Sequence, residues 1–220
     1  FDKRRFKLVD KSENSLTYTL HSPDKDMGFP GNFDLTVVYT VTEDNELVIY
    51  YVGKCDQKTY ACITNHAYFN LNGKNSSVLN HSVQIDSDYY LPLDKDSIPT
   101  GEKRKVDGGA FDFRQEKTLA KDFRRDPQME AALGYDHPFL IKGDLNKAFI
   151  KVTSDDKKLS MEVYTDYPAF QMYTGNYVHQ GDNNIIARDD GLVYQDQCAV
   201  CIEPEFYPDC PHLEQFKDVN

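Results

Sequence analysis

A histidine and a glutamate that lie far apart in the sequence have the residue types of an acid/base pair. His66 lies in the segment Thr64-Asn-His-Ala-Tyr-Phe-Asn-Leu71, among residues that favour strands. Glu203 directly follows the apolar run 198–202. Histidine exchanges protons near neutral pH, and burial raises the pKa of a carboxyl and makes it a better base. Each residue also has a structural interpretation, as a satisfied histidine in the protein interior or a strand-end glutamate facing water.

A second carboxylate, Glu205, follows two residues after Glu203. In a regular strand the two side chains would share one face, and paired carboxylates are typical of glycosidases. Pro204 stands between them and argues against a regular strand. The sequence alone therefore leaves the geometry of this pair open.

Two further segments place polar groups beside apolar strands. Asp136 stands in Gly134-Tyr-Asp-His-Pro-Phe139, where it can accept hydrogen bonds from hydroxyl groups or simply end a turn. Gln171 and Tyr173 alternate onto one face of a predicted strand. Near His66, the Asn65 amide can orient the imidazole or bind hydroxyls, and the Tyr68 ring suits the apolar C–H face of a sugar.

The dominant period along the chain is two, which predicts strands. A strand is expected over 15–21, and 33–41 with 46–52 is predicted to form an antiparallel hairpin. Helical patterning is confined to 117–133, where one or two short helices are interrupted by Pro127. The remaining strands are expected near 82–86, 138–142, 147–153, 158–165, 169–174 and 198–203. This pattern predicts an all-β fold, a large antiparallel β-sandwich with little helix, as a single domain over 1–220.

Composition limits the classes of partner. The net charge of −11 disfavours nucleic acid, because a phosphate backbone would be repelled. No apolar run approaches the roughly 20 residues that span a bilayer, and no signal peptide opens the chain, so we expect no membrane partner and a cytoplasmic location. The odd count of five cysteines argues against a disulfide scaffold, and Cys198 and Cys201 are interpreted as small core residues. No nucleotide-binding motif or metal-ligand spacing is present, so no cofactor or metal is expected.

Four motifs, in order, resemble those of the aldose 1-epimerases, also called galactose mutarotases. Asn65-His-Ala-Tyr-Phe-Asn-Leu71 is similar to the family's NH(S/T)YFNL signature, and Gly134-Tyr-Asp-His-Pro-Phe139 to its GxDHxF segment. Gln171-Met-Tyr-Thr-Gly-Asn176 resembles its QxYTxN strand, and Cys201-Ile-Glu-Pro-Glu-Phe-Tyr-Pro-Asp209 its LETQxFPD segment. Phe1-Asp-Lys-Arg4 and two glycine-containing segments, 28–31 and 98–101, also fit. The resemblance covers essentially the whole chain.

The resemblance implies a large antiparallel β-sandwich that interconverts the α and β anomers of free aldoses such as galactose or glucose. It implies Glu203 as general base and His66 as general acid, with Asp136 and Gln171 holding sugar hydroxyls. We add Tyr68 and Asn65 to the predicted substrate-binding residues. The partner expected is a small aldose sugar, and the sequence does not predict an oligomeric state.

The chain also departs from the family pattern. Glu205 stands where the family usually has Gln, and Pro204 where it usually has Thr. The family's earlier segment, which carries an arginine and a histidine of the sugar site, has no counterpart here, and we expect the chain to lack that segment and the final strands. The alternative interpretations are a non-catalytic carbohydrate-binding sandwich or inactive relative and, from the two glutamates, a glycosidase.

Overall fold

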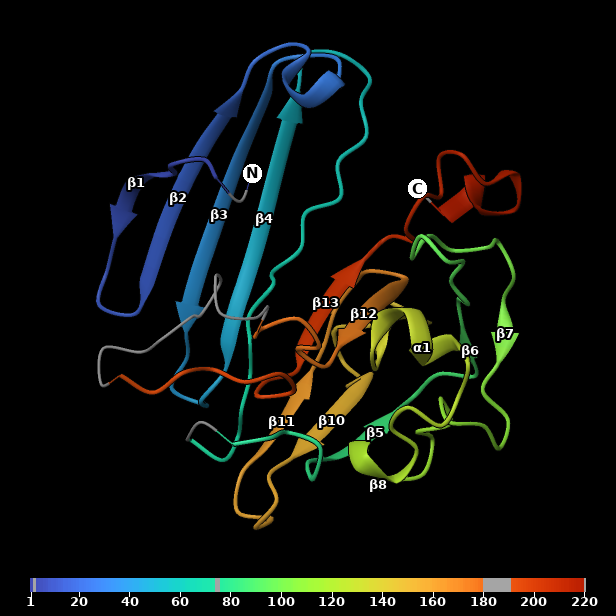
Figure 1. The fold of residues 1–220 in the computed structure, drawn as a ribbon. Coiled ribbons are helices and arrows are strands. Elements are labelled where there is room, and N and C mark those ends of the chain that lie inside the picture. Colours follow the sequence, from blue (N-terminus) through green and yellow to red (C-terminus); the bar gives the residue numbers. More distant parts are fainter. Residues whose placement is uncertain (2, 74–75, 180–190, 220) are drawn as a thin grey trace. The chain divides into compact units, whose positions relative to one another are not determined.

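The computed structural model divides the chain into two compact units, Phe1–Ile63 and Thr64–Asn220 (Figure 1). It describes residues 1, 3–73, 76–179 and 191–219. Asp2 belongs to the segment Phe1–Arg4, which resembles the family pattern, and it lies outside the described residues. Each unit has its own antiparallel sheets, and the single domain over 1–220 stays a prediction.

The first unit is a four-stranded antiparallel sheet of order β1-β2-β3-β4. The predicted strand over 15–21 and the predicted hairpin are both present. In the hairpin, Val41 pairs with Leu47 and the turn contains Asn45 at φ 62°, a left-handed conformation that asparagine tolerates. The strands of this unit are β1 Lys7–Lys11, β2 Ser15–Ser22, β3 Phe33–Val41 and β4 Leu47–Cys55, and a short 3₁₀ turn covers Asp26–Gly28.

The second unit contains two antiparallel sheets, of order β11-β10-β5-β8 and β13-β12-β9-β6-β7. Strands are present at all six predicted places; four are shorter than expected, and β9 and β13 are displaced, to Asp136–Leu140 from 138–142 and to Cys201–Glu205 from 198–203. The first sheet is built from β5 Ser82–Ile85, β8 Lys117–Thr118, β10 Ile150–Thr153 and β11 Ser160–Val163. The second is built from β6 Tyr89–Tyr90, β7 Arg104–Lys105, β9 Asp136–Leu140, β12 Ala169–Tyr173 and β13 Cys201–Glu205.

One apolar core lies between these two sheets. Residues of both contribute to the same buried cluster, so the unit is a β-sandwich, as predicted. Phe170 of β12 is central to it, with its ring centroid 5.5 Å from that of Phe139 and 4.6 Å from that of Phe149. The core members contributed by strands are Val83, Ile85, Tyr90, Phe139, Ile150, Val152, Phe170, Met172 and Ile202.

Helix is scarce, and the α-helix falls where the sequence predicts it, whereas two 3₁₀ segments lie outside the predicted range. A 3₁₀ turn at Leu119–Lys121 and the helix α1 at Gln128–Ala132 lie within the predicted range 117–133. Pro127 precedes α1 with φ −53°, so its ring is compatible with the helix start. A further 3₁₀ segment, Glu214–Val219, follows β13. Among the described residues, no helix has the length and apolar character needed to cross a membrane.

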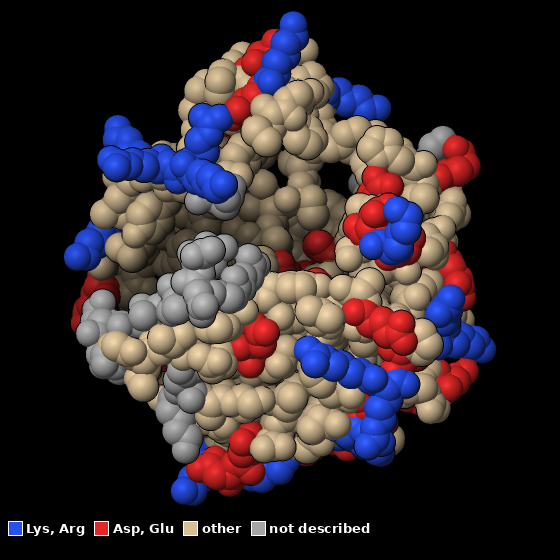
Figure 2. Space-filling view, viewed as in Figure 1, with Lys and Arg blue, Asp and Glu red and all other residues tan. Residues whose placement is uncertain are grey.

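Charged side chains cover both units. Acidic and basic residues are both present on the face shown in Figure 2, in a chain whose net charge is −11. Arg114, for example, contacts Asp88, Asp107 and Asp112 at 2.8–3.0 Å. Exposed pairs of this kind contribute little to stability, so the core above holds the second unit together.

Candidate active site

A cavity of about 470 Å³ lies in the second unit, along the β13-β12-β9 part of the five-stranded sheet. The described part of the chain lines it with polar and aromatic side chains, among them three carboxylates but neither Lys nor Arg. The lining residues are His66, Tyr68, Leu93, Ser97, Pro99, Asp136, Pro138, Gln171, Tyr173, Tyr177, Glu203, Glu205 and Pro208.

The pairing of three strands brings the predicted polar residues together. Gln171 of β12 pairs with Glu203 of β13 on one side and with Pro138 of β9 on the other, and Tyr173 pairs with Asp136. Because directly paired residues point to the same face of a sheet, these side chains form adjacent rows. The Gln171 amide donates a hydrogen bond of 2.7 Å to Asp136 Oδ1.

Pro204 does not interrupt β13. The strand runs regularly from Cys201 to Glu205, with Phe170 paired to Pro204 and Ala169 to Glu205. Among the described residues β13 is an edge strand, where the missing N–H of a proline costs no ladder bond on the open side. Glu203 and Glu205 therefore lie on the same face, which resolves the geometry that the sequence left open.

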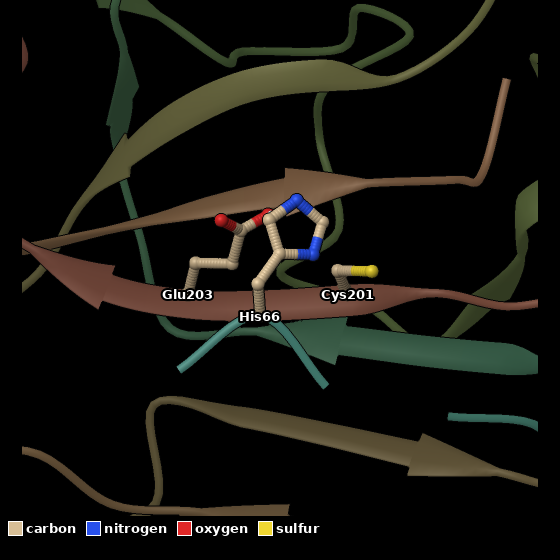
Figure 3. Close-up of side chains that lie close together, drawn as sticks. All are labelled: His66, Cys201 and Glu203. Atoms are coloured by element: carbon tan, nitrogen blue, oxygen red, sulfur yellow. The ribbon is translucent and has the colours of Figure 1, made fainter. Parts of the chain in front are cut away.

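His66 reaches the same face from a loop. Its Nε2 atom lies 3.5 Å from Glu203 Oε1, and Figure 3 shows the two side chains directed toward each other over β13. The imidazole stacks on Tyr68, with 5.0 Å between ring centroids, and meets the edge of Tyr173 at 6.0 Å. The side chain is half-exposed, whereas that of Glu203 is nearly buried.

The segment around His66 is not a regular strand, although its residue types favour strands. It joins the sheet structure through one bridge, between Phe69 and Val200. The Asn70 amide fixes it further by donating to the carbonyl oxygens of Cys198 and Ser76, at 2.8 and 2.7 Å. These local hydrogen bonds replace a ladder and hold the loop against the start of β13.

Burial perturbs all three carboxyls of the cavity in the same direction. It raises the pKa of Glu203 to about 7, with the nearby Asp136 adding to the rise. The pKa of Glu205 is raised to about 8 by burial and by Glu203 and Asp136. Burial also raises the pKa of Asp136, against the opposing effects of Gln171 and His66. Groups with such shifts in a cavity are candidates for proton transfer.

Five of the six predicted site residues line the cavity, and Asn65 does not. The Asn65 Oδ1 atom instead accepts a hydrogen bond of 3.1 Å from the backbone N–H of Ala67, so it shapes the turn that carries His66. His137 packs in the interior against Phe111, and burial lowers its pKa to about 4. The residues that line the cavity are His66, Tyr68, Asp136, Gln171 and Glu203.

Sequence reasoning missed several lining residues. Tyr177 stacks with Tyr173 at 6.4 Å, and its backbone N–H donates to the Tyr173 hydroxyl at 3.0 Å. The only feature of the sequence that points to Tyr177 is its position four residues after Tyr173, which was predicted to lie in a strand. Ser97, Pro99 and Pro208 come from loops whose path no local pattern predicts.

His66, Cys201 and Glu203 have potential ligand atoms within 4.8 Å of one another (Figure 3). The sequence did not predict this cluster, because its members come from different segments. Burial raises the pKa of the Cys201 thiol, so the sulfur is protonated when no cation is bound. None of the five cysteines, all of them described, forms a disulfide, and Cys198 and Cys201 are buried as predicted. The absence of a metal stays a prediction.

Comparison with known proteins shows the family of the chain. The family model described as aldose 1-epimerase matches residues 1–220. The chain belongs to the aldose 1-epimerase family. It is 41% identical to an aldose 1-epimerase of Escherichia coli K12, over 96% of this chain and 60% of that protein. It is 36% identical to the human galactose mutarotase, over 94% of this chain and 58% of that protein.

Solved structures agree with this membership. The GalM/aldose epimerase homologue of Caenorhabditis elegans superposes with a TM-score of 0.86 at 27% identity, covering 98% of this chain and 63% of that one. The galactose 1-epimerase of Lactobacillus acidophilus gives a TM-score of 0.78 at 29% identity, covering 92% of this chain and 57% of that one. The family resemblance and the antiparallel β-sandwich predicted from the sequence are both confirmed. The chain spans about three fifths of the length of the relatives it matches.

Proposed function

We propose that the protein containing this chain is an aldose 1-epimerase, which interconverts the α and β anomers of a free aldohexose such as galactose or glucose. The observation that carries the proposal is the pairing of His66 with Glu203 at 3.5 Å inside a polar cavity. Family membership supports it, because related chains bear the names aldose 1-epimerase and galactose mutarotase.

Glu203 is the proposed general base. The anomeric hydroxyl of the bound sugar gives its proton to the Glu203 carboxylate, and the electron pair of that O–H bond forms the aldehyde carbonyl. The bond between C1 and the ring oxygen then breaks. A pKa of about 7 leaves a large part of Glu203 ionised at neutral pH and makes it a stronger base than an ordinary glutamate.

His66 is the proposed general acid. The imidazolium gives a proton to the ring oxygen as the ring opens, so no alkoxide has to form. Rotation about the C1–C2 bond of the open-chain aldehyde turns the other carbonyl face toward the C5 hydroxyl. Ring closure with the two proton transfers reversed yields the other anomer and restores Glu203 and His66 to their starting states.

Asp136 and Gln171 are proposed to hold sugar hydroxyls. Their mutual hydrogen bond of 2.7 Å fixes both side chains, and the Gln171 Oε1 atom is buried without a hydrogen-bond partner among the described residues. A sugar hydroxyl can donate to that oxygen and remove the cost of leaving it unpaired. Tyr68 is proposed to pack against the C–H face of the sugar, and Asn65 to act through the turn that positions His66.

Polarimetry of the full-length protein tests the proposal. Freshly dissolved α-D-galactose or α-D-glucose should approach its equilibrium rotation faster with the protein than without it. The Glu203→Gln protein is the control, because it keeps the shape of the side chain and loses the base. Sugar binding without faster mutarotation would identify a carbohydrate-binding module or inactive relative. Release of the aglycone from an aryl galactoside would indicate a glycosidase.

Other properties of the whole protein remain predictions. A cytoplasmic location and the absence of a nucleic acid or membrane partner are predicted from the sequence. The net charge of −11 supports the absence of a nucleic acid partner.

A further inference from the structure

Glu205 is a second carboxyl in the cavity, and the mechanism above does not use it. It lines the cavity beside Glu203, two residues along β13 and on the same face. The residue paired with it across the ladder is Ala169, whose small side chain leaves the glutamate without a polar neighbour at that position. Its Oε1 atom is buried and has no hydrogen-bond partner among the described residues.

The charges around Glu205 are unfavourable for an ionised carboxylate. Among the described residues that line the cavity there is no Lys or Arg, and the titratable groups that share it with Glu205 are Asp136, Glu203, His66, Tyr68, Tyr173 and Tyr177. The imidazole of His66 lies beside Glu203. An ionised carboxylate is costly when one of its oxygens is buried without a hydrogen-bond donor, as Glu205 Oε1 is among the described residues, whereas a neutral carboxyl is tolerated if a ligand completes its hydrogen bonding.

We propose that Glu205 binds the sugar as an un-ionised carboxylic acid that donates its O–H to a substrate oxygen, while Glu203 is the ionised member of the pair. This inference rests on the proposed function for the identity of the ligand. Sugar oxygens are acceptors, so a neutral carboxyl can replace an amide as donor at this position. Glu205 is thereby a specificity-determining residue of the site.

The order in which the two carboxyls titrate agrees with this assignment. Burial and the neighbouring carboxyls raise the pKa of Glu205 to about 8, whereas the pKa of Glu203 is raised to about 7. Between the two titrations one proton remains on the pair, and the imidazole of His66 beside Glu203 favours Glu205 as the carboxyl that holds it. The two groups interact, so the pair titrates in two macroscopic steps.

The first experiment measures protonation directly, without reference to activity. Full-length protein labelled with ¹³C at the glutamate carboxyls is titrated by NMR, and the Glu205→Gln variant identifies the Glu205 resonance. We expect that resonance to titrate above neutral pH. A midpoint near the ordinary glutamate value of about 4.3 would overturn the inference.

The second experiment measures binding of D-galactose by calorimetry at about pH 7 and about pH 9, on either side of the Glu205 titration. Wild-type affinity should fall by about 5-fold to 10-fold between them, the scale of one lost hydrogen bond. Glu205→Gln keeps a permanent N–H donor and should lose less affinity with pH. Glu205→Leu removes the donor and should bind weakly at both pH values. Glu162→Gln, an exposed change on β11, is the matched control and should follow the wild type.

The outcomes separate this inference from the proposed function. Tighter binding by the wild type at the higher pH would mean that Glu205 works as an ionised acceptor, and would overturn the inference. Equal binding by Glu205→Leu and the wild type at about pH 7 would show that the carboxyl does not contact the sugar, and would overturn it as well. If both experiments give the expected results and mutarotation is not accelerated, the inference stands and the enzymatic proposal fails.

Discussion

The two faces of the strands β9, β12 and β13 differ in what their side chains do. On the inner face, Phe139, Phe170 and Ile202 are buried in the core of the sandwich. On the outer face, the residues next to them in sequence, including Gln171 and Glu203, line the cavity. Side chains alternate along a strand, so one stretch of backbone contributes side chains to both faces. Core packing on one face therefore fixes the spacing of polar groups on the other.

The two faces should therefore affect different free energies: the activation and binding free energies on the outer face, and the free energy of unfolding on the inner face. Changes on the outer face should affect proton transfer and sugar binding, and should affect unfolding mainly through the titration of the buried carboxyls. Changes on the inner face should affect unfolding, and should alter activity only where the strands move. Glu203 and Phe170 lie in neighbouring strands and are suitable probes of the two faces.

The largest expected effect is the loss of the proposed base. Glu203→Gln should lower the mutarotation rate by roughly 10²–10⁴-fold, the usual scale for one general base, while the unfolding midpoint changes little at about pH 4, where the wild-type carboxyl is also neutral. His66→Asn should give a loss of similar size, because ring opening needs both proton transfers. Polarimetry and thermal unfolding of the same samples measure both quantities. Unchanged rates in both variants would mean that the proposed mechanism does not operate.

On the inner face, Phe170→Ala should destabilise the protein by about 3–5 kcal/mol, the usual cost of a large aromatic truncation in a core. Phe170 is fully buried, between Phe139 and Phe149. Leu159→Ala, at a residue that is about half-exposed, is the control and should change stability by less than about 0.5 kcal/mol. Denaturant unfolding measures both changes. Equal effects of the two substitutions would contradict the assignment of Phe170 to the core.

The features that the sequence predicted are those that depend on the alternation of side chains along a strand. Alternation predicted the strands, and it also placed Gln171 and Tyr173 on one side of β12. The proximity of His66 and Glu203 needed tertiary information, which the family motifs supplied before any geometry was known. The turn role of Asn65 was not predictable, because an asparagine side chain bonds equally well to a ligand or to a nearby backbone N–H.

The loops account for what the sequence could not predict. Ser97, Pro99 and Pro208 approach the cavity from segments without periodicity, so alternation does not assign them to it, although Pro99 and Pro208 lie in segments that resemble the family pattern. The sequence also could not decide whether β13 continues regularly through Pro204. That depends on β13 being the edge strand of the described sheet. Strand order is a tertiary property that a local proline rule does not contain.

The acid side of the pH–rate profile should report Glu203. Its pKa is raised to about 7 by burial, and only the ionised form accepts a proton. The rate should therefore rise with pH up to about 7, and fall by about tenfold for each pH unit below that value if this group alone controls it. Polarimetry across this range, corrected for the uncatalysed reaction, measures the midpoint. A midpoint near the ordinary glutamate value of about 4.3 would contradict the burial of the proposed base.

The same carboxyls should make stability depend on pH in an unusual direction. Because the pKa values of Asp136, Glu203 and Glu205 are raised, the folded protein binds more protons than the unfolded chain between about pH 4 and about pH 8. Stability contributed by these groups is present at low pH and is lost as pH rises through that window. The slope is at most about 1.4 kcal/mol per pH unit for each proton. Denaturant unfolding at several pH values should show a smaller slope in Glu203→Gln and in Glu205→Gln.

The smallest expected effect distinguishes the ring of Tyr68 from its hydroxyl. The ring stacks on His66 at 5.0 Å between centroids, and the side chain is about half-exposed. Tyr68→Phe keeps the stacking surface and should change kcat/KM by less than about 3-fold, because an exposed hydroxyl exchanges a protein hydrogen bond for one to water. Tyr68→Ala removes the ring, and should cost about 10-fold through lost packing against His66 and the sugar. If Tyr68→Phe were as damaging as Tyr68→Ala, the hydroxyl would be the functional group and the outer face would recognise the sugar through one more polar contact.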